Sequence, residues 1–260
     1  MKVSFRKQLK VWKSVLFALF LREMQSQFND KLGLAWAFLE PFAFIFGLSY
    51  MRSMMGGGDV HSIPVFIFMM IGMISIQSFM TPINTTSNAF KRNKPLYAFR
   101  QVQPISALLV SGFVEFSIKI VVITLAGIAL YLLKIQVQID NPILLICMYF
   151  SLWIFTISIS CIVGIIVAYL PEFHKITGLL TRPLFFISCI FFSLQDIPME
   201  YWHYLTWNPL VHFIELSRFA CFESYGSNGV SIGFALGATF TAFFFALCLY
   251  HLTWKGILSR

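Results

Sequence analysis

Six long apolar stretches follow an N-terminal segment in which basic and apolar residues are interspersed. The stretches cover residues 34–50, 63–83, 105–133, 142–170, 175–194 and 230–250. An α-helix rises about 1.5 Å per residue, so roughly 20 apolar residues cross a bilayer core of about 30 Å. The pattern therefore predicts an all-α polytopic membrane protein with six transmembrane helices.

The fifth stretch is interrupted by Pro183 and is followed by Asp196. The uninterrupted run that remains, residues 184–195, is short enough to form a re-entrant segment instead of a span. Parity favours a span, because six crossings return the C-terminus to the side of the N-terminus. Arg182 can reach the interface by snorkelling.

The N-terminal segment resembles a signal peptide only superficially. Its apolar run, residues 15–21, is followed by Arg22 and Glu23 without a small-residue cleavage site. We expect an amphipathic helix in the membrane interface, with an uncleaved anchor as the alternative. The apolar face would present Leu9, Trp12, Leu16, Leu19 and Phe20 to lipid. The polar face would present Lys10, Lys13, Arg22 and Glu23 to water.

Charge is scarce and unevenly distributed. Of the 260 residues 58% are apolar and 12% are charged, against roughly 25% in soluble domains. The 19 Lys and Arg outnumber the 11 Asp and Glu, but they lie between apolar stretches, which argues against nucleic-acid binding. Only Arg52, Lys134 and Arg218 fall on the far side of the expected topology. The positive-inside rule then places both termini in the cytoplasm.

Motifs for chemistry are missing from the sequence. No P-loop occurs, and glycines 56–58 are followed by Asp59 and His61 instead of a lysine. The five Cys and five His are scattered without the spacing of a metal site. We therefore expect neither ATP hydrolysis nor a metal centre on this chain, which leaves transport, channel or scaffold roles.

Three polar segments interrupt this apolar chain. Residues 84–104 form a basic connection far longer than two antiparallel helices need, so they either dock a cytoplasmic partner or form a solvated loop. Glu115 and Lys119 are spaced i,i+4 inside an apolar stretch, as a structural pair or as part of a pathway. The apolar run 210–222 is broken by Glu215 and Arg218 and is too short to span. It predicts a re-entrant periplasmic hairpin between the fifth and sixth spans.

Three groups of residues stand in a recognisable order across almost the whole chain. They are Leu32-Gly33-Leu34-Ala35-Trp36 with Pro41; Lys94-Pro95-Leu96 with Pro104; and Asn208-Pro209-Leu210, Glu215, Arg218 and Tyr225-Gly226. In this order and spacing the chain resembles the membrane-spanning subunit of type 2 ABC exporters. Within that family it is similar to the capsular polysaccharide permeases of Gram-negative bacteria.

The resemblance implies a homodimeric permease of the bacterial inner membrane that moves lipid-linked polysaccharide outward. Two copies of a separate P-loop ATPase would bind at the cytoplasmic face and carry the ATP and Mg, so no cofactor is expected on this chain. Periplasmic and outer-membrane export partners are also implied. The expected division is an interfacial segment 1–31, a transmembrane domain 32–251 and a cytoplasmic tail 252–260.

The resemblance also suggests two sets of functional residues. The set expected to couple to the ATPase is Met24, Gln27, Asp30, Lys31, Lys91, Arg92, Lys94, Tyr97 and Arg100. The set expected to line the path of an acidic polymer is Tyr50, Arg52, Glu115, Lys119, Lys134, Trp202, Trp207, Glu215 and Arg218.

Other functions fit the same sequence pattern. An exporter of similar architecture could carry O-antigen, teichoic acid, a small lipid or a drug. A membrane-bound glycan-modifying enzyme would use His203 or His212 with Glu215 as acid and base. A structural scaffold is the third alternative, and it would not stimulate a partner ATPase.

Overall fold

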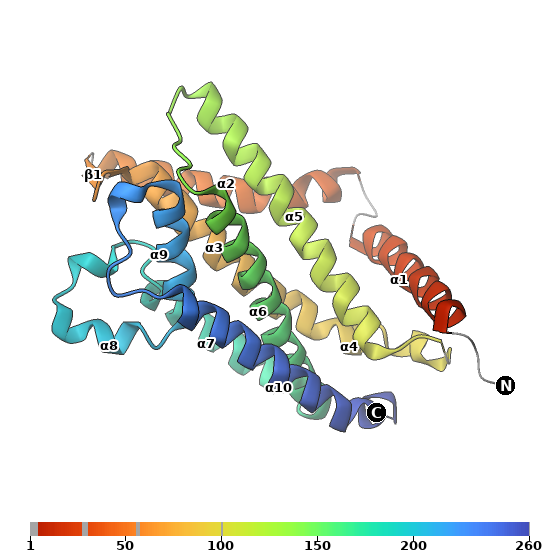
Figure 1. Ribbon diagram of the computed structural model, residues 1–260. Helices are drawn as coiled ribbons and strands as arrows, with labels where there is room; N and C mark the ends of the chain where they lie inside the picture. Colours follow the sequence, from red (N-terminus) through yellow and green to blue (C-terminus); the bar gives the residue numbers. More distant parts are fainter. Residues whose placement is uncertain (1–4, 28–30, 56–57, 100, 260) are drawn as a thin grey trace.

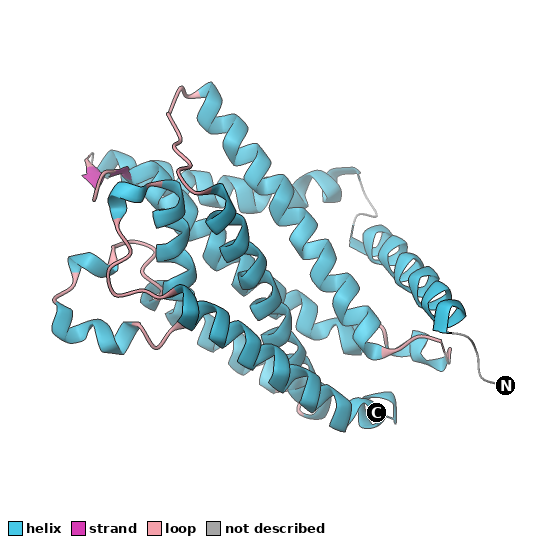
Figure 2. Ribbon diagram, in the orientation of Figure 1, coloured by secondary structure: helices cyan, strands magenta, loops and turns pink. Residues whose placement is uncertain are grey.

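The computed structural model describes residues 5–27, 31–55, 58–99 and 101–259, and almost all of them are helical (Figures 1 and 2). The long helices are α1 (Phe5–Gln27), α2 (Lys31–Met55), α3 (Val65–Thr85), α5 (Pro104–Leu132), α6 (Pro142–Tyr169) and α10 (Ile232–Ser259). The shorter helices are α4 (Ala89–Arg92), α7 (Phe173–Ile187), α8 (Trp202–Leu205) and α9 (Pro209–Cys221). Single 3-10 turns are η1 (Thr86–Asn88), η2 (Lys94–Ala98), η3 (Leu194–Asp196), η4 (Met199–Tyr201) and η5 (Glu223–Tyr225).

The strands of the described chain are β1 (Asp59–Val60) and β2 (Ile63–Pro64), which form one short antiparallel hairpin. Asp59 pairs with Pro64 and Val60 with Ile63. The hairpin joins α2 to α3, so it serves as a tight turn between two helices.

Four segments within the described residues are long and apolar enough to cross a membrane. They are Val65–Arg92, Pro104–Leu132, Pro142–Tyr169 and Ile232–Leu258. They match the second, third, fourth and sixth apolar stretches of the sequence, and the expected all-α polytopic architecture is confirmed at this level. Prolines 104, 142 and 209 are the first residues of α5, α6 and α9. Proline lacks a backbone N–H, and at the first position of a helix this costs nothing because that N–H would have no acceptor within the helix.

Helix boundaries differ from the sequence prediction in two places. Helix α7 ends at Ile187, although the fifth apolar stretch continues to Leu194. Cys189 has a φ of 56°, a left-handed conformation that a right-handed helix cannot continue through. Helix α10 continues to Ser259, so most of the expected tail 252–260 is helical.

Helix α3 is the centre of the packing. It contacts α2, α5, α6, α7 and α9, and residues 65–74 are buried without interruption. Helix α10 packs along α6, while α1 packs against α5 (Figure 1). Because protein surrounds α3, apolar residues occupy every face of this helix. The periodicity of its sequence therefore does not single out one buried face.

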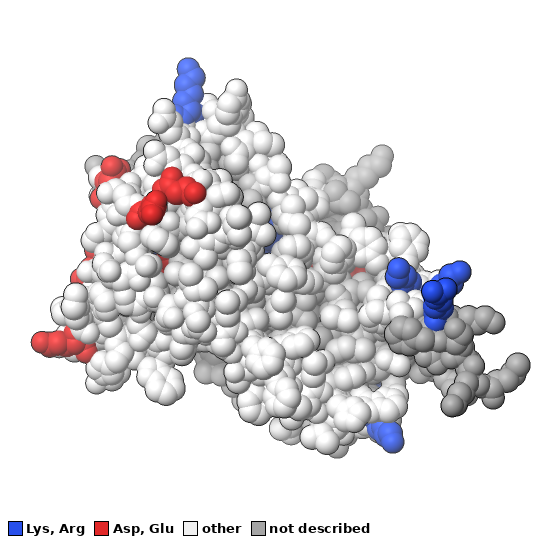
Figure 3. Space-filling model, in the orientation of Figure 1, with Lys and Arg blue, Asp and Glu red and all other residues white. Residues whose placement is uncertain are grey.

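The two ends of the bundle carry opposite charge. Both termini lie at one end with α4, and β1 and α8 lie at the other (Figure 1). Figure 3 shows blue side chains mostly at the first end and red ones at the second. We call them the basic end, with exposed Lys10, Lys13, Lys91, Lys94 and Lys255, and the acidic end, with exposed Asp59, Asp140, Asp196, Glu200 and Glu223.

Candidate functional site

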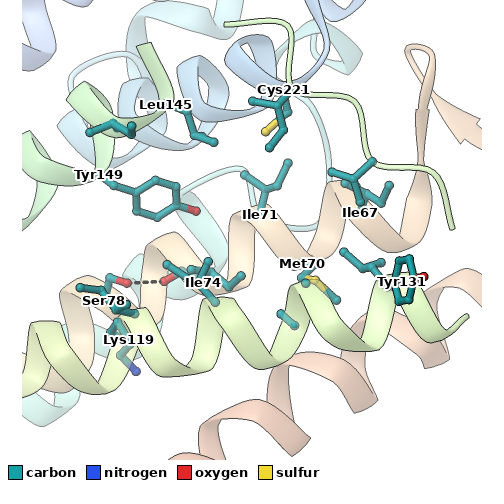
Figure 4. Close-up of a pocket in the computed structure, with 18 of the residues that line it drawn as sticks. Ile67, Met70, Ile71, Ile74, Ser78, Lys119, Tyr131, Leu145, Tyr149 and Cys221 are labelled. Carbon is teal, nitrogen blue, oxygen red and sulfur yellow. Dashed lines mark hydrogen bonds between the residues drawn. The ribbon is translucent and has the colours of Figure 1, made fainter. Parts of the chain in front are cut away.

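A cavity of about 1160 Å³ lies between α3, α5, α6 and the segment 133–139 that follows α5. Figure 4 shows its apolar wall, in which Ile67, Met70, Ile71 and Ile74 of α3 stand along the hollow opposite α5. Leu145 and Tyr149 of α6 close the third side, with Cys221 of α9 nearby. The lining is aliphatic and aromatic over most of its area, which suits a hydrocarbon ligand better than a sugar.

Few polar groups reach this cavity. Lys119 lies near Ser78, and Tyr131 stands at the opposite end of the hollow (Figure 4). Lys119 is 5% exposed, and its Nζ lies 3.5 Å from Oγ1 of Thr81. Glu115 precedes Lys119 by one helical turn and is equally buried. Together with Lys134, these residues are the part of the expected substrate pathway that the structure brings to one cavity.

Arg218 and Glu215 lie elsewhere, in a closed network at the acidic end. The Arg218 side chain is fully buried, and its Nη1 lies 3.0 Å from Glu215 Oε1. Its N–H groups also donate to the carbonyl oxygens of Cys189 at 2.8 Å and Ile190 at 2.9 Å. The guanidinium carbon stands 3.5 Å from the centre of the Phe68 ring. All these contacts are internal, so Arg218 fixes α9 against α3 and residues 189–190.

The other carboxylate oxygen of Glu215 accepts a 2.5 Å hydrogen bond from the Tyr225 hydroxyl. Burial and the neighbouring carboxylate raise the pKa of Tyr225, so this phenol remains a donor. Gly72 of α3 makes room for the network, because a Cβ there would lie 2.7 Å from Nη2 of Arg218. The sequence suggested that Glu215 and Arg218 meet the substrate, whereas the structure places both inside the protein.

The remaining pathway residues are spread over the acidic end. Tyr50 and Arg52 are exposed on the last turns of α2, and Tyr50 stacks on Phe46. Trp202 is half-buried and donates to the Ile197 carbonyl at 2.8 Å. Trp207 is 81% exposed. These four side chains do not line the cavity of Figure 4.

At the basic end, α1 is fastened to α4 by two neighbouring contacts. Arg92 forms an ion pair with Glu23, and Arg22 donates to Oδ1 of Asn93 at 2.9 Å. Arg92 also donates to the Ser111 hydroxyl of α5 at 3.3 Å. The sequence prediction that Glu23 faces water is therefore wrong: its side chain is buried because Arg92, distant in sequence, supplies the opposite charge.

The other residues expected to couple to the ATPase differ in exposure. Lys91 and Lys94 are exposed, whereas Met24 and Tyr97 are half-buried. Burial raises the pKa of Tyr97, whose hydroxyl has no hydrogen-bond partner within the described part of the chain. Asp30 and Arg100 lie outside the described residues, as do the side chains of Gln27 and Lys31.

Comparison with known proteins identifies the family. The model of the family described as "ABC-2 type transporter" matches residues 14–222, which is most of the chain. The chain belongs to this family. It is 35% identical to the polysialic acid transport protein KpsM of Escherichia coli, over 98% of this chain and 99% of the relative.

More distant relatives point the same way. The capsule polysaccharide export inner-membrane protein BexB of Haemophilus influenzae is 22% identical over 98% of this ABC-2 chain and 97% of its own length. CtrC of Neisseria meningitidis, which has the same description, is 22% identical over 84% and 82%. These relatives are described as transport or export proteins, and none of these descriptions names an enzyme.

His212, one candidate acid or base of the alternative enzyme, has both ring nitrogens in hydrogen bonds within the protein. The backbone N–H of Ser231 donates to Nδ1 of His212 at 3.0 Å, so Nε2 carries the proton and donates to the Thr206 carbonyl at 2.9 Å. Burial lowers the pKa of His212, which favours this neutral form. His203, the other candidate, is exposed, and its ring centre lies 3.8 Å from that of Tyr204, with the two rings tilted by 40°.

Sequence reasoning missed the contacts that fasten α1. Trp12 was expected to face lipid, yet its Nε1 donates to the Ser106 hydroxyl at 3.0 Å. Glu23 and Arg92 are 69 positions apart, so local spacing carries no signal of their pairing. The one available clue was an acidic residue at the end of an otherwise basic amphipathic segment.

Proposed function

We propose that this chain is the permease subunit of an ATP-driven exporter that moves capsular polysaccharide across the bacterial inner membrane. The observation that carries the proposal is its 35% identity, over nearly the full length, to a polysialic acid transport protein. Two further relatives that are described as capsule polysaccharide export proteins of the inner membrane support the same substrate class. A lipid-linked form of the polymer is the proposed cargo.

We further propose six crossings with both termini in the cytoplasm. In support, the termini lie at the same end of the bundle, and that end carries exposed lysines (Figures 1 and 3). In this topology α2 and α7 supply the two crossings beyond the four long apolar helices, and residues 196–229 form a re-entrant hairpin. Helix α7 has 15 residues, about 22 Å of helix, so residues 188–193 would complete its crossing.

The proposed energy source is a P-loop ATPase that binds at the basic end. Exposed Lys91 and Lys94 are the proposed contacts, with Arg92 holding their segment to α1 and α5. ATP and Mg would reside on that ATPase. Periplasmic and outer-membrane partners would receive the polymer at the acidic end, near Tyr50, Arg52, Trp202 and Trp207.

A homodimer with two ATPase subunits is the proposed assembly. Helix α7 contacts α3 and α6 with one face, and its other face leaves Leu179, Leu180 and Phe186 exposed. Two copies related by a two-fold axis would bury the same face on each other. A Leu179→Cys variant in a cysteine-free background should then form a disulfide with the same residue of the second copy, whereas Phe150→Cys, at the cavity between α5 and α6, should not.

The decisive experiment for the function is deletion of the gene in its host. The proposal predicts loss of surface capsule with polymer retained in the cell, and recovery when the chain is restored. A P-loop ATPase should co-purify with the gently solubilised, tagged chain in equal amount. Unchanged capsule in the deletion strain, with loss of O-antigen, teichoic acid or another lipid, would assign a different cargo.

A further inference from the structure

The cavity of Figure 4 opens between two helices that are long enough to cross the membrane. Ile120 and Ile123 of α5 line it and are exposed, as are Ile146 and Phe150 of α6. Both helices have the length and hydropathy of a membrane span, and Glu115 and Lys119 of α5 are the charged residues within them. The opening between them therefore faces the hydrocarbon core of the bilayer and not water.

The α3 side of this hollow gives ordered water no partners. A buried water needs two to four polar partners, and the wall formed by Ile67, Met70, Ile71 and Ile74 supplies none from its side chains. An empty hollow of about 1160 Å³ would leave its lining atoms without dispersion contacts on one side. Fluid acyl chains at the opening are the material that fills it.

A cation marks one end of the cavity. Lys134 lies two residues beyond the end of α5, has a φ of 56° and is exposed, and it lines the hollow together with Tyr131. The other charges in the lining, Glu115 and Lys119, have opposite signs and lie one turn apart on the same helix. The net charge offered to a ligand is thus the single positive charge of Lys134, which suits a phosphate group.

We propose that this cavity is a binding site for a phospholipid of the bilayer. The acyl chain lies between α3, α5 and α6, and the phosphate lies at Lys134. The lipid replaces packing that the protein itself does not provide between α3 and the α5–α6 pair. This site is separate from the acidic-end residues proposed for the polysaccharide, and it does not depend on which polymer is exported.

Gly127 allows a sharp test. It lines the cavity, and a Cβ added there meets nothing within 4 Å. Gly127→Phe adds a large ring at the lining of the hollow from an unobstructed Cβ, and Gly127→Ala raises helix propensity without filling the hollow. Gly178→Phe on α7 is a matched control, because a Cβ at Gly178 also meets open space and Gly178 does not line this cavity.

The measurements use the purified full chain in detergent, with and without added dioleoylphosphatidylglycerol. At a hundredfold excess over Kd, the lipid should raise the Tm of the wild type, Gly127→Ala and Gly178→Phe by roughly 5–10 °C. Gly127→Phe should show little rise. Native mass spectrometry should detect one retained phospholipid on the wild type and none on Gly127→Phe.

Lys134→Gln provides a second variant at an exposed position that does not threaten folding. It should reduce phospholipid retention at least severalfold, whereas Lys255→Gln, an exposed lysine at the basic end, should not. Equal retention by Gly127→Phe and the wild type would overturn the proposal. So would retained masses that correspond to lipid-linked polymer, or an unchanged Tm shift in both Gly127→Phe and Lys134→Gln.

Discussion

Glu23 of α1 and Arg92 of α4 form an ion pair, and the residues beside them, Arg22 and Asn93, form a hydrogen bond. The two contacts run in parallel, so α1 and α4 are joined at two points. Arg92 also reaches Ser111 of α5. A displacement of the 89–98 segment by a bound partner would therefore move α1 and the start of α5 with it.

This pair should contribute measurably to stability. Glu23→Gln should lower the unfolding free energy by about 1–2 kcal/mol, because Glu23 is buried while Arg92 remains partly exposed and screened. A double-mutant cycle with Arg92→Gln should give a coupling free energy of about 1–2 kcal/mol. Thermal unfolding in detergent measures both values, and Lys10→Gln on the exposed face of α1 is the control. A coupling free energy near zero would show that the two side chains act independently.

The exposed lysines at the same end should govern ATPase binding. Lys91→Ala combined with Lys94→Ala should weaken binding of the ATPase about tenfold, as the loss of roughly 0.7 kcal/mol per charge requires. The variant should accumulate in the membrane at the wild-type level, because neither side chain is buried. Pull-down titration of the ATPase measures the effect, with Lys10→Ala combined with Lys13→Ala as the matched control. Normal ATPase binding and normal export by the Lys91→Ala, Lys94→Ala variant would show that these lysines are not part of the interface.

Arg218 should be essential for folding. Arg218→Ala leaves the buried Glu215 carboxylate without its counter-charge, so it should cost about 3–5 kcal/mol. Arg218→Met combined with Glu215→Leu should cost less, since no charge is then left buried without a partner. Gly72→Val should also destabilise, because its side chain would occupy the place of the guanidinium. The amount of folded protein after extraction, compared with Glu223→Gln, reports these effects; equal yields for Arg218→Ala and wild type would contradict them.

His212 makes stability depend on pH. Burial lowers the pKa of His212 below its ordinary value of 6.5, so the unfolded chain binds a proton more readily than the folded one. The stability contributed by the neutral ring is present above about pH 6.5 and is lost as the pH falls through and below that value. The drop in Tm between pH 7.5 and 5.5 should be smaller for His212→Asn than for wild type. His174→Asn, at an exposed position, should behave as wild type, and equal drops in all three proteins would contradict the prediction.

Much of the architecture follows from apolar run length alone. The apolar runs that form α3, α5, α6 and α10 are long enough to cross a bilayer as single helices. For such segments, apolar composition over about 20 residues is enough to predict a transmembrane helix. The end of α7 does not follow from composition, because residues 188–194 are as apolar as the helix before them. The left-handed backbone at Cys189 depends on packing against α9, which no local pattern encodes.

The candidate site was predictable only in part. Glu115 and Lys119 stand out in the sequence because charges inside an apolar stretch are rare. Arg218 stands out for the same reason, but whether such a charge lines a path or closes a network depends on its partners. Two of those partners are carbonyl groups of residues 189 and 190, and the amino-acid sequence does not show where backbone atoms lie.

The contacts of Arg218 also explain how α7 can stop where it does. When a helix breaks off among apolar neighbours, the carbonyl groups of the following residues lose the amide donors of the next turn, and hydrocarbon offers no replacement. The guanidinium of Arg218 donates to two such carbonyls, and the amide of Leu194 finds its acceptor in Glu215. The Arg218–Glu215 ion pair of α9 thus supplies hydrogen-bond partners that a further turn of α7 would otherwise have supplied. These partners allow the chain to bend among apolar neighbours without leaving these backbone groups unpaired.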